Sequence, residues 1–135
     1  MVKMLNSSKL FIIIGSENNI NLNKRQVIVW DNNKEIEVYK FTIENEILNL
    51  EIISNKIILV CANKILVYNS NSFELIESIN TRPNPKGLIA VGYIVRNILA
   101  YPNIDLEHGK LIIKNYDTQN NIFLIMLKMI YLYFH

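Results

Sequence analysis

The stretch QVIVWDNNKEIEVYKF (residues 26–41) reads as two strands joined by a polar turn, and the chain repeats it. It aligns with KILVYNSNSFELIESI (residues 64–79) at an offset of 38 residues. In both copies an apolar strand ends in an aromatic residue and Asp or Asn, and an alternating outer strand follows the turn. A third first strand, KLIIKNYDTQN (residues 110–120), comes 46 residues after the second, without a recognisable outer strand. A four-strand unit repeated at about 40 residues is typical of β-propeller blades.

Strand-like runs continue along the chain, and helical periodicity is nearly absent. Runs such as KIILVC lack alternation, which is typical of strands covered on both faces. The expected fold is all-β, a partial WD40-type β-propeller of about three antiparallel four-stranded blades. The expected strands are residues 9–15, 26–31, 35–41, 47–53, 56–62, 64–69, 73–79, 87–94, 97–101 and 110–116.

Composition sets the broad class. The 135 residues suffice for one domain, and 50% hydrophobic with 19% charged residues excludes a disordered chain. The net charge of +2 is too small for a dedicated nucleic-acid binder, so no nucleic-acid partner is expected. The single cysteine, Cys61, lies in an apolar run and is interpreted as a buried core residue, and a cytoplasmic setting is expected.

Few residues form a chemically suggestive pattern. Asp105, Glu107 and His108 share a polar turn, but they are too few for a metal site. We interpret Trp30 as a blade-packing residue and Asp31 as an acceptor in a turn. The sequence has no Gly-rich phosphate loop, nucleophile elbow or defined carboxylate pair, so we expect neither an enzyme nor a cofactor.

A stiff corner, NTRPNPKGLIAV (residues 80–91), interrupts the strands. Pro83 and Pro85 cannot donate ladder hydrogen bonds, so strand pairing should stop there. Gly87 permits close approach of the backbone. We therefore expect the chain to cross here from the outer strand of one sheet to an innermost strand, beginning at Gly87, of the next.

Several pieces, in order, carry a family resemblance: VIVWD (residues 27–31), EILNLEIISNKIILVCANKILVYN (46–69), FELIESINTRPNPKGLIAV (73–91) and NILAYPN (97–103). Together they resemble the PROPPIN family, seven-bladed WD-repeat proteins of autophagy that bind phosphatidylinositol 3-phosphate and the 3,5-bisphosphate. The resemblance implies a scaffold protein, peripherally associated in its full-length form with phosphoinositide-bearing membranes. It covers about residues 3–115, and the NPKGL corner is its most specific element.

The lipid-binding signature of that family is missing. No Phe-Arg-Arg-Gly occurs, and the only arginines, Arg25, Arg82 and Arg96, are not adjacent. Anchoring a phosphorylated inositol needs convergent cationic groups. We therefore assign no lipid-binding residue in this chain and expect phosphoinositide binding only in the full-length relative.

The resemblance implies how the chain divides into blades, and it implies one partner-docking surface within it. Residues 1–121 would form a partial propeller, with 1–43 as blade two, 44–83 as blade three and 84–121 as an incomplete blade four. The family's autophagy lipid-transfer partner docks on loops of blades two and three, a position occupied here by Asn23, Lys24 and Arg25. These match the loop position and not the family residues, so a solvated hairpin loop is the alternative. A stand-alone β-sheet interaction module without lipid binding is the alternative for the whole chain.

Residues 122–135, IFLIMLKMIYLYFH, match no repeat and are expected to lie outside the fold. They are too short for an unbroken transmembrane helix. We interpret them as the product of truncation or read-through, with an interfacial anchor as the alternative.

Since three blades cannot close a ring, two apolar sheet faces should stay bare and favour association or insolubility.

Overall fold

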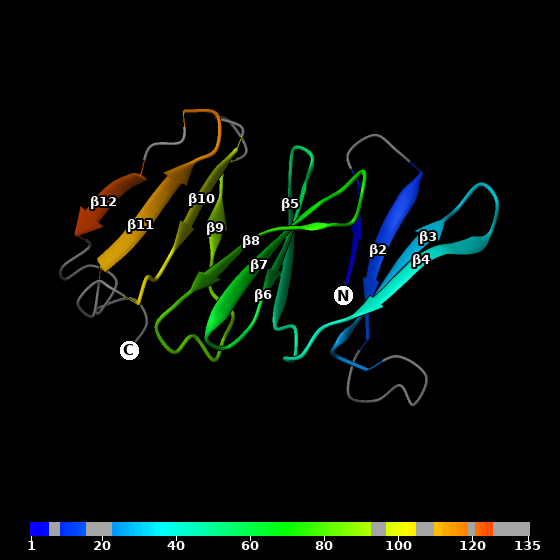
Figure 1. Cartoon of the computed structure of the whole chain (residues 1–135), viewed down its shortest axis with the longest axis horizontal. Helices are drawn as coiled ribbons and strands as arrows, with labels where there is room; N and C mark the ends of the chain where they lie inside the picture. Colours follow the sequence, from blue (N-terminus) through cyan, green and yellow to red (C-terminus); the bar gives the residue numbers. More distant parts are fainter. Residues whose placement is uncertain (6–8, 16–22, 93–96, 105–109, 119–120, 126–135) are drawn as a thin grey trace.

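The structure is a computed structural model of the chain, and it describes residues 1–5, 9–15, 23–92, 97–104, 110–118 and 121–125. The described part is all-β and comprises three four-stranded antiparallel sheets, which confirms the predicted fold class. In each sheet, strands consecutive in the chain are neighbours. Figure 1 shows the three sheets side by side along the longest axis of the molecule.

We call the sheets first, middle and last. The first sheet contains β1 (Val2–Met4), β2 (Leu10–Ile14), β3 (Gln26–Asp31) and β4 (Ile36–Thr42). The middle sheet contains β5 (Asn49–Ile53), β6 (Lys56–Val60), β7 (Lys64–Asn69) and β8 (Leu75–Asn80). The last sheet contains β9 (Ala90–Val91), β10 (Ile98–Tyr101), β11 (Lys110–Asn115) and β12 (Asn121–Ile125).

The turn before each outer strand is built the same way in all three sheets. The Oδ1 atom of Asp31 accepts hydrogen bonds from two backbone N–H groups, those of Asn33 and Lys34, at 2.9 and 3.1 Å. Asn69 and Asn115 accept the equivalent pairs, at 2.7 and 3.2 Å and at 2.9 and 3.3 Å. Such bonds fix a tight turn without help from the rest of the fold. The interpretation of Asp31 as a turn acceptor is confirmed.

The outer strands of the first and middle sheets share two further irregularities. Glu35 and Phe73 both take positive φ, 53° and 58°, at the end of the turn. The register then shifts between Val29 and Trp30, and again between Val67 and Tyr68. Because turn, backbone kink and bulge recur at equivalent positions, the sequence repeat is a structural repeat.

The hydrophobic core is divided into two layers, one on each side of the middle sheet. Ile57 and Leu59 of β6 belong to the layer shared with the first sheet, where Ile12 and Val29 also lie. The intervening Ile58 belongs to the layer shared with the last sheet, as do Val60, Leu99 and Ile112. Since side chains alternate along a strand, β6 is buried on both faces, and its sequence therefore lacks polar alternation.

Two strands of the structure were missed in the sequence. β1 is only three residues long and all of them are exposed, so it is too short to show a recognisable period. β12 pairs with β11 from Lys110–Ile125 to Lys114–Asn121, so the expectation that the chain leaves the fold at residue 122 is wrong for residues 122–125. Alternation is absent from this apolar segment, and only its pairing shows that it is the outer strand. The rest of the expected tail, residues 126–135, lies outside the described residues.

The corner at residues 80–91 differs from its prediction in one respect. Gly87 does not begin an innermost strand, because β9 starts only at Ala90. Asn84 closes the corner: it accepts from the Leu88 N–H and donates to the Leu88 carbonyl, both at 2.9 Å. Gly87 has φ +62°, and a Cβ there would lie 2.8 Å from the Cβ of Leu48. The close approach predicted for this glycine is confirmed.

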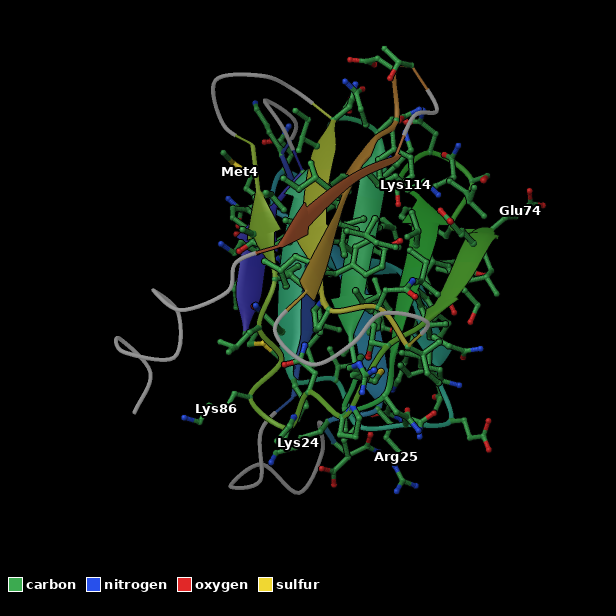
Figure 2. The ribbon with its side chains drawn as sticks, turned by 90° about the vertical axis from the view of Figure 1, so that its left-hand side faces the viewer. Met4, Lys24, Arg25, Glu74, Lys86 and Lys114 are labelled. Carbon is green, nitrogen blue, oxygen red and sulfur yellow. The ribbon has the colours of Figure 1, made fainter. Side chains whose placement is uncertain are left out.

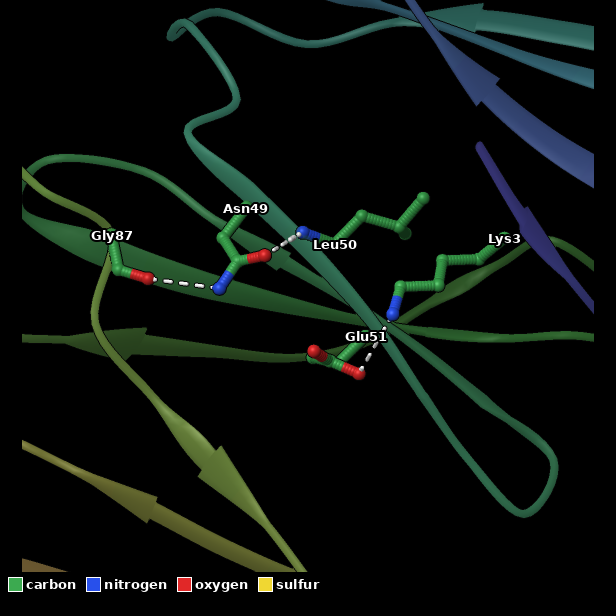
Figure 3. Close-up of polar contacts among 5 residues, drawn as sticks. All are labelled: Lys3, Asn49, Leu50, Glu51 and Gly87. Carbon is green, nitrogen blue, oxygen red and sulfur yellow. Dashed lines mark hydrogen bonds and ion pairs between the residues drawn. The ribbon is translucent and has the colours of Figure 1, made fainter. Parts of the chain in front are cut away.

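The innermost strand of the middle sheet, β5, is tied to both neighbouring parts of the chain (Figure 3). The Asn49 side chain donates to the Gly87 carbonyl at 3.1 Å, on the way to the last sheet. The Glu51 carboxylate lies 3.7 Å from the Lys3 Nζ of β1. β5 is therefore the strand through which the middle sheet contacts both the corner and β1.

A second tie joins the middle and last sheets near their outer strands. Glu77 of β8 pairs with Lys114 and accepts a hydrogen bond from the Tyr116 hydroxyl at 3.2 Å. Lys56 and Lys114 lie 5.0 and 4.8 Å from the centroid of the Tyr116 ring. Burial and the neighbouring Glu77 carboxylate raise the pKa of Tyr116 well above its ordinary value.

Replacing Gly87 by Ala should destabilise the fold by about 2–4 kcal/mol, because the left-handed backbone and the contact with Leu48 both oppose a Cβ. Urea unfolding followed by far-UV circular dichroism measures the change. Lys86→Ala, at the exposed neighbouring position, is the matched control and should change little. Equal stability of the two variants would contradict the close approach.

The Tyr116 site predicts loss of stability at alkaline pH. The folded state holds the phenol proton more tightly than the unfolded chain, so stability should fall as pH rises above about 10, the ordinary tyrosine pKa. In Tyr116→Phe this fall should be shallower, as measured by urea unfolding from pH 8 to 11. An unchanged slope in Tyr116→Phe would refute the assignment.

Candidate partner-docking surface

The predicted docking residues lie in the loop between β2 and β3, immediately before β3. Asn23 forms a turn of its own: its Oδ1 accepts from the Arg25 N–H at 2.8 Å, and its carbonyl accepts from the Gln26 N–H at 3.2 Å. Asn23 and Arg25 are exposed, and Lys24 is half-buried. Residues 16–22 of the same loop lie outside the described residues. The described end of the loop is therefore a shaped turn that presents two polar side chains to solvent.

The backbone of this loop is fixed by the segment that leads from the first sheet to the middle sheet. The Ile43 N–H donates to the Arg25 carbonyl at 2.9 Å, and the Ile47 N–H donates to the Lys24 carbonyl at 2.8 Å. Ile43 and Ile47 are themselves buried in the core layer between these sheets. The core thus fixes this crossing segment (residues 43–48) by burying Ile43 and Ile47. The backbone N–H groups of the same two residues then fix the loop.

Sequence reasoning found the loop but missed the charged residues that the fold brings to it. Glu44 and Glu46 are exposed in the crossing segment, between the buried Ile43 and Ile47 whose N–H groups hold the loop. Lys64 lies 3.9 Å from Glu44, whose side chain is 89% exposed, so this pair is weak and easily exchanged. Their only sequence signal is the pattern IENEI, in which both acidic residues lie between the two buried isoleucines. The backbone hydrogen bonds of Ile43 and Ile47, which continue from the β3–β4 pair, bring this segment alongside Lys24 and Arg25.

Figure 2 places Lys24, Arg25 and Lys86 at the same end of the molecule. We call the docking surface the set of Asn23, Lys24, Arg25, Glu44 and Glu46. It carries both signs of charge and is supported by backbone hydrogen bonds. A surface of this kind suits a protein segment with complementary charges, for which the exposed Glu44 can exchange its weak pair with Lys64.

The structure places the other candidate residues in structural roles or outside the described region. Cys61 is fully buried in the core, which confirms its interpretation, and burial raises the pKa of its thiol. Trp30 is half-buried on β3, opposite Phe11. The acidic turn with His108 lies outside the described residues. Within the described ranges no group of three His, Cys, Asp or Glu side chains could hold a metal ion.

The two arginines that the structure describes lie in different elements, Arg25 before β3 and Arg82 after β8. Arg96 lies outside the described residues. The described part of the chain has no helix of the length and hydrophobicity needed to cross a bilayer.

Repeated four-stranded antiparallel sheets, stacked face to face, define the class of protein: these are blades of a WD-repeat β-propeller. The β-propeller domain of Cps50 (Swd1) from Myceliophthora thermophila shares this arrangement, with a TM-score of 0.63 and 9% sequence identity over 92% of this chain and 38% of that one. A higher TM-score, 0.74, is reached with KlAtg21 in its complex with the coiled-coil of AgAtg16, at 15% identity over 96% and 42% of the two chains.

Sequence comparison adds the family. The chain is 30% identical over 127 residues to Autophagy-related protein 18 of Saccharomyces cerevisiae (strain S288c), which covers 90% of this chain and 24% of the relative. No family model matches the chain. The chain belongs to the PROPPIN family, and it spans about a quarter of the length of this curated relative. Which blades of the ring its sheets represent stays a prediction.

Proposed function

We propose that this chain is a non-enzymatic docking part of an autophagy scaffold, and that it binds a protein partner through the docking surface. The observation that carries the proposal is the fixed loop: the Lys24 and Arg25 carbonyls are held by N–H groups of the crossing segment at 2.8 and 2.9 Å. A surface ordered before binding loses less conformational entropy when a partner docks. Membership of the PROPPIN family supplies the cellular context.

Two partners are consistent with this surface. The family resemblance points to the autophagy lipid-transfer protein, and the solved KlAtg21 complex contains a coiled-coil of AgAtg16. We propose the lipid-transfer protein, because its docking loop in the family occupies the position of Asn23, Lys24 and Arg25. Binding of the coiled-coil alone would retain the docking role and reassign the partner.

The phosphoinositide function is assigned to the full-length relatives and not to this chain. Binding an inositol phosphate requires convergent cationic groups. Of the arginines that the structure describes, Arg25 and Arg82 belong to different connections, and no Phe-Arg-Arg-Gly occurs in the sequence.

Reversing the charge of Arg25 tests the docking role. Arg25→Glu should weaken binding to the lipid-transfer protein of the same organism by about tenfold, the equivalent of about 1.4 kcal/mol, in a quantitative pull-down. The Asn23→Ala variant should also weaken binding, because the turn loses its acceptor. Lys34→Glu is the matched control: it reverses one exposed charge in the turn at the opposite end of β3. Equal loss in the control, or no loss in Arg25→Glu, would argue for the solvated-loop alternative.

Vesicle flotation tests the lipid assignment separately. The chain should float equally with neutral vesicles and with vesicles containing phosphatidylinositol 3-phosphate or the 3,5-bisphosphate, because a bidentate cationic site is not written in its sequence. A full-length relative serves as the positive control. Flotation of this chain that depends on the headgroup would show that lipid binding needs no Phe-Arg-Arg-Gly segment.

A further inference from the structure

The outer strand of the first sheet, β4, has an open edge. At seven residues it is the longest strand of the described part, whereas exposed edge strands are usually very short. It stands at the end of the order β1-β2-β3-β4, and no described strand pairs with its far side (Figure 1). The strand contains no proline, and all its residues but one are exposed. It therefore lacks two of the usual protections against pairing with a further strand.

The phase of the hydrogen bonds shows which backbone groups of this edge face outward. The Ile43 N–H donates to the Arg25 carbonyl at 2.9 Å, so these two residues form a hydrogen-bonded pair that continues the β3–β4 register. In an antiparallel ladder such pairs alternate with pairs that are not bonded to each other. The backbone groups of Lys40, Thr42 and Glu44 therefore point away from the sheet, and all three residues are exposed.

The middle sheet shows what such an edge can accept. Thr81 follows Ile43 by 38 residues, the offset of the repeat. Its N–H donates to the Asn63 carbonyl at 2.9 Å, as the Ile43 N–H does to Arg25. Thr81 also forms an antiparallel bridge with Asn103, which follows β10 of the last sheet. A segment of the next sheet thus pairs with the outer edge at the position equivalent to Ile43.

The first sheet has no equivalent segment among the described residues. Asn103 lies in the connection between β10 and β11, residues 102–109. The corresponding connection of the middle sheet is only residues 61–63, and it turns back at once, since the Cys61 N–H donates to the Lys64 carbonyl at 2.8 Å. A connection this short cannot extend to the edge beside Ile43. Within the described part of the chain, the outward backbone groups of Thr42 and Glu44 are left open.

We propose that the docked partner supplies the missing segment, as an extended stretch that pairs antiparallel to the outer edge at Thr42 and Glu44. The inference rests on the proposed docking function and deepens it, because Glu44 belongs to the docking surface and Arg25 is bonded to the intervening Ile43. Strand addition to an exposed edge derives its affinity from main-chain hydrogen bonds and its specificity from alternate side chains.

The charges along the edge define the chemistry of the partner segment. Lys40 and Glu44 lie on the same side of the edge, because alternate side chains share a side. Opposite charges placed across a strand pair are stabilising, and like charges are destabilising. An antiparallel segment therefore fits when a basic residue faces Glu44 and an acidic residue, four positions later, faces Lys40.

Amide hydrogen exchange, read residue by residue, tests the pairing. In the free chain the Thr42 and Glu44 amides should exchange fast, whereas Phe41 and Ile43 should be protected by their bonds to the first sheet. Saturation with the autophagy lipid-transfer protein of the same organism should slow exchange at Thr42 and Glu44 by at least about tenfold. Exchange at Ser78, which faces outward on β8 of the middle sheet, should not change.

Proline substitution tests the same contact by affinity. Thr42→Pro removes an outward N–H and no ladder bond, so the fold should persist, because edge strands tolerate proline at such positions. Binding in the quantitative pull-down should weaken about fivefold, the effect of one lost hydrogen bond. Ser78→Pro is the matched control: it also removes an outward N–H, and it should bind as the wild type does.

The results separate strand addition from docking. If Arg25→Glu loses binding while Thr42→Pro binds normally and the edge amides stay fast, the strand addition is overturned and the docking function stands. Absence of any binding by the wild-type chain overturns both. Binding of the coiled-coil alone, with unchanged exchange at the edge, also overturns the strand addition, because a helix bonds its own main-chain groups. If Thr42→Pro fails to fold, exchange in the wild type decides the question.

Discussion

The structure depends on one constraint: a sheet built from strands that are apolar on both sides must be covered on both sides. β6 satisfies it within the chain, because its residues 57–60 alternate between two core layers and all are buried. The first and last sheets each share one of these core layers with the middle sheet. Each interface between sheets therefore repeats the same packing of apolar strand faces.

Polar contacts near β5 add directional links between the stacked sheets. The Asn49 side chain reaches the Gly87 carbonyl, while Glu51 meets Lys3 of β1. At the outer strands Glu77 is paired with Lys114 and Tyr116. Directional contacts at both the inner and outer strands complement a hydrophobic core that is itself non-directional.

The docking surface is a consequence of the same architecture. Ile43 and Ile47 are buried in a core layer, and their N–H groups hold the carbonyls of Arg25 and Lys24. The connection between the first and middle sheets thus orders the β2–β3 loop of the first sheet. Substitutions in the core between the sheets should therefore also disturb the loop.

The sequence by itself determined the local units. The turns at Asp31 and Asn69 and the alternating strands that follow them could be predicted, because these signals act within a few residues. Gly87 was also legible, since a close approach demands this residue. β1 and β12 were not, because a three-residue exposed strand and an evenly apolar strand carry no period, and their assignment depends on pairing with β2 and β11. The segment with Glu44 and Glu46 lies beside the docking loop because it continues the β3–β4 pairing, in which Gln26 is opposite Thr42. The placement of Glu77 beside Lys114 and Tyr116 was decided only by the tertiary structure, because sheet stacking and not sequence spacing brings these residues together.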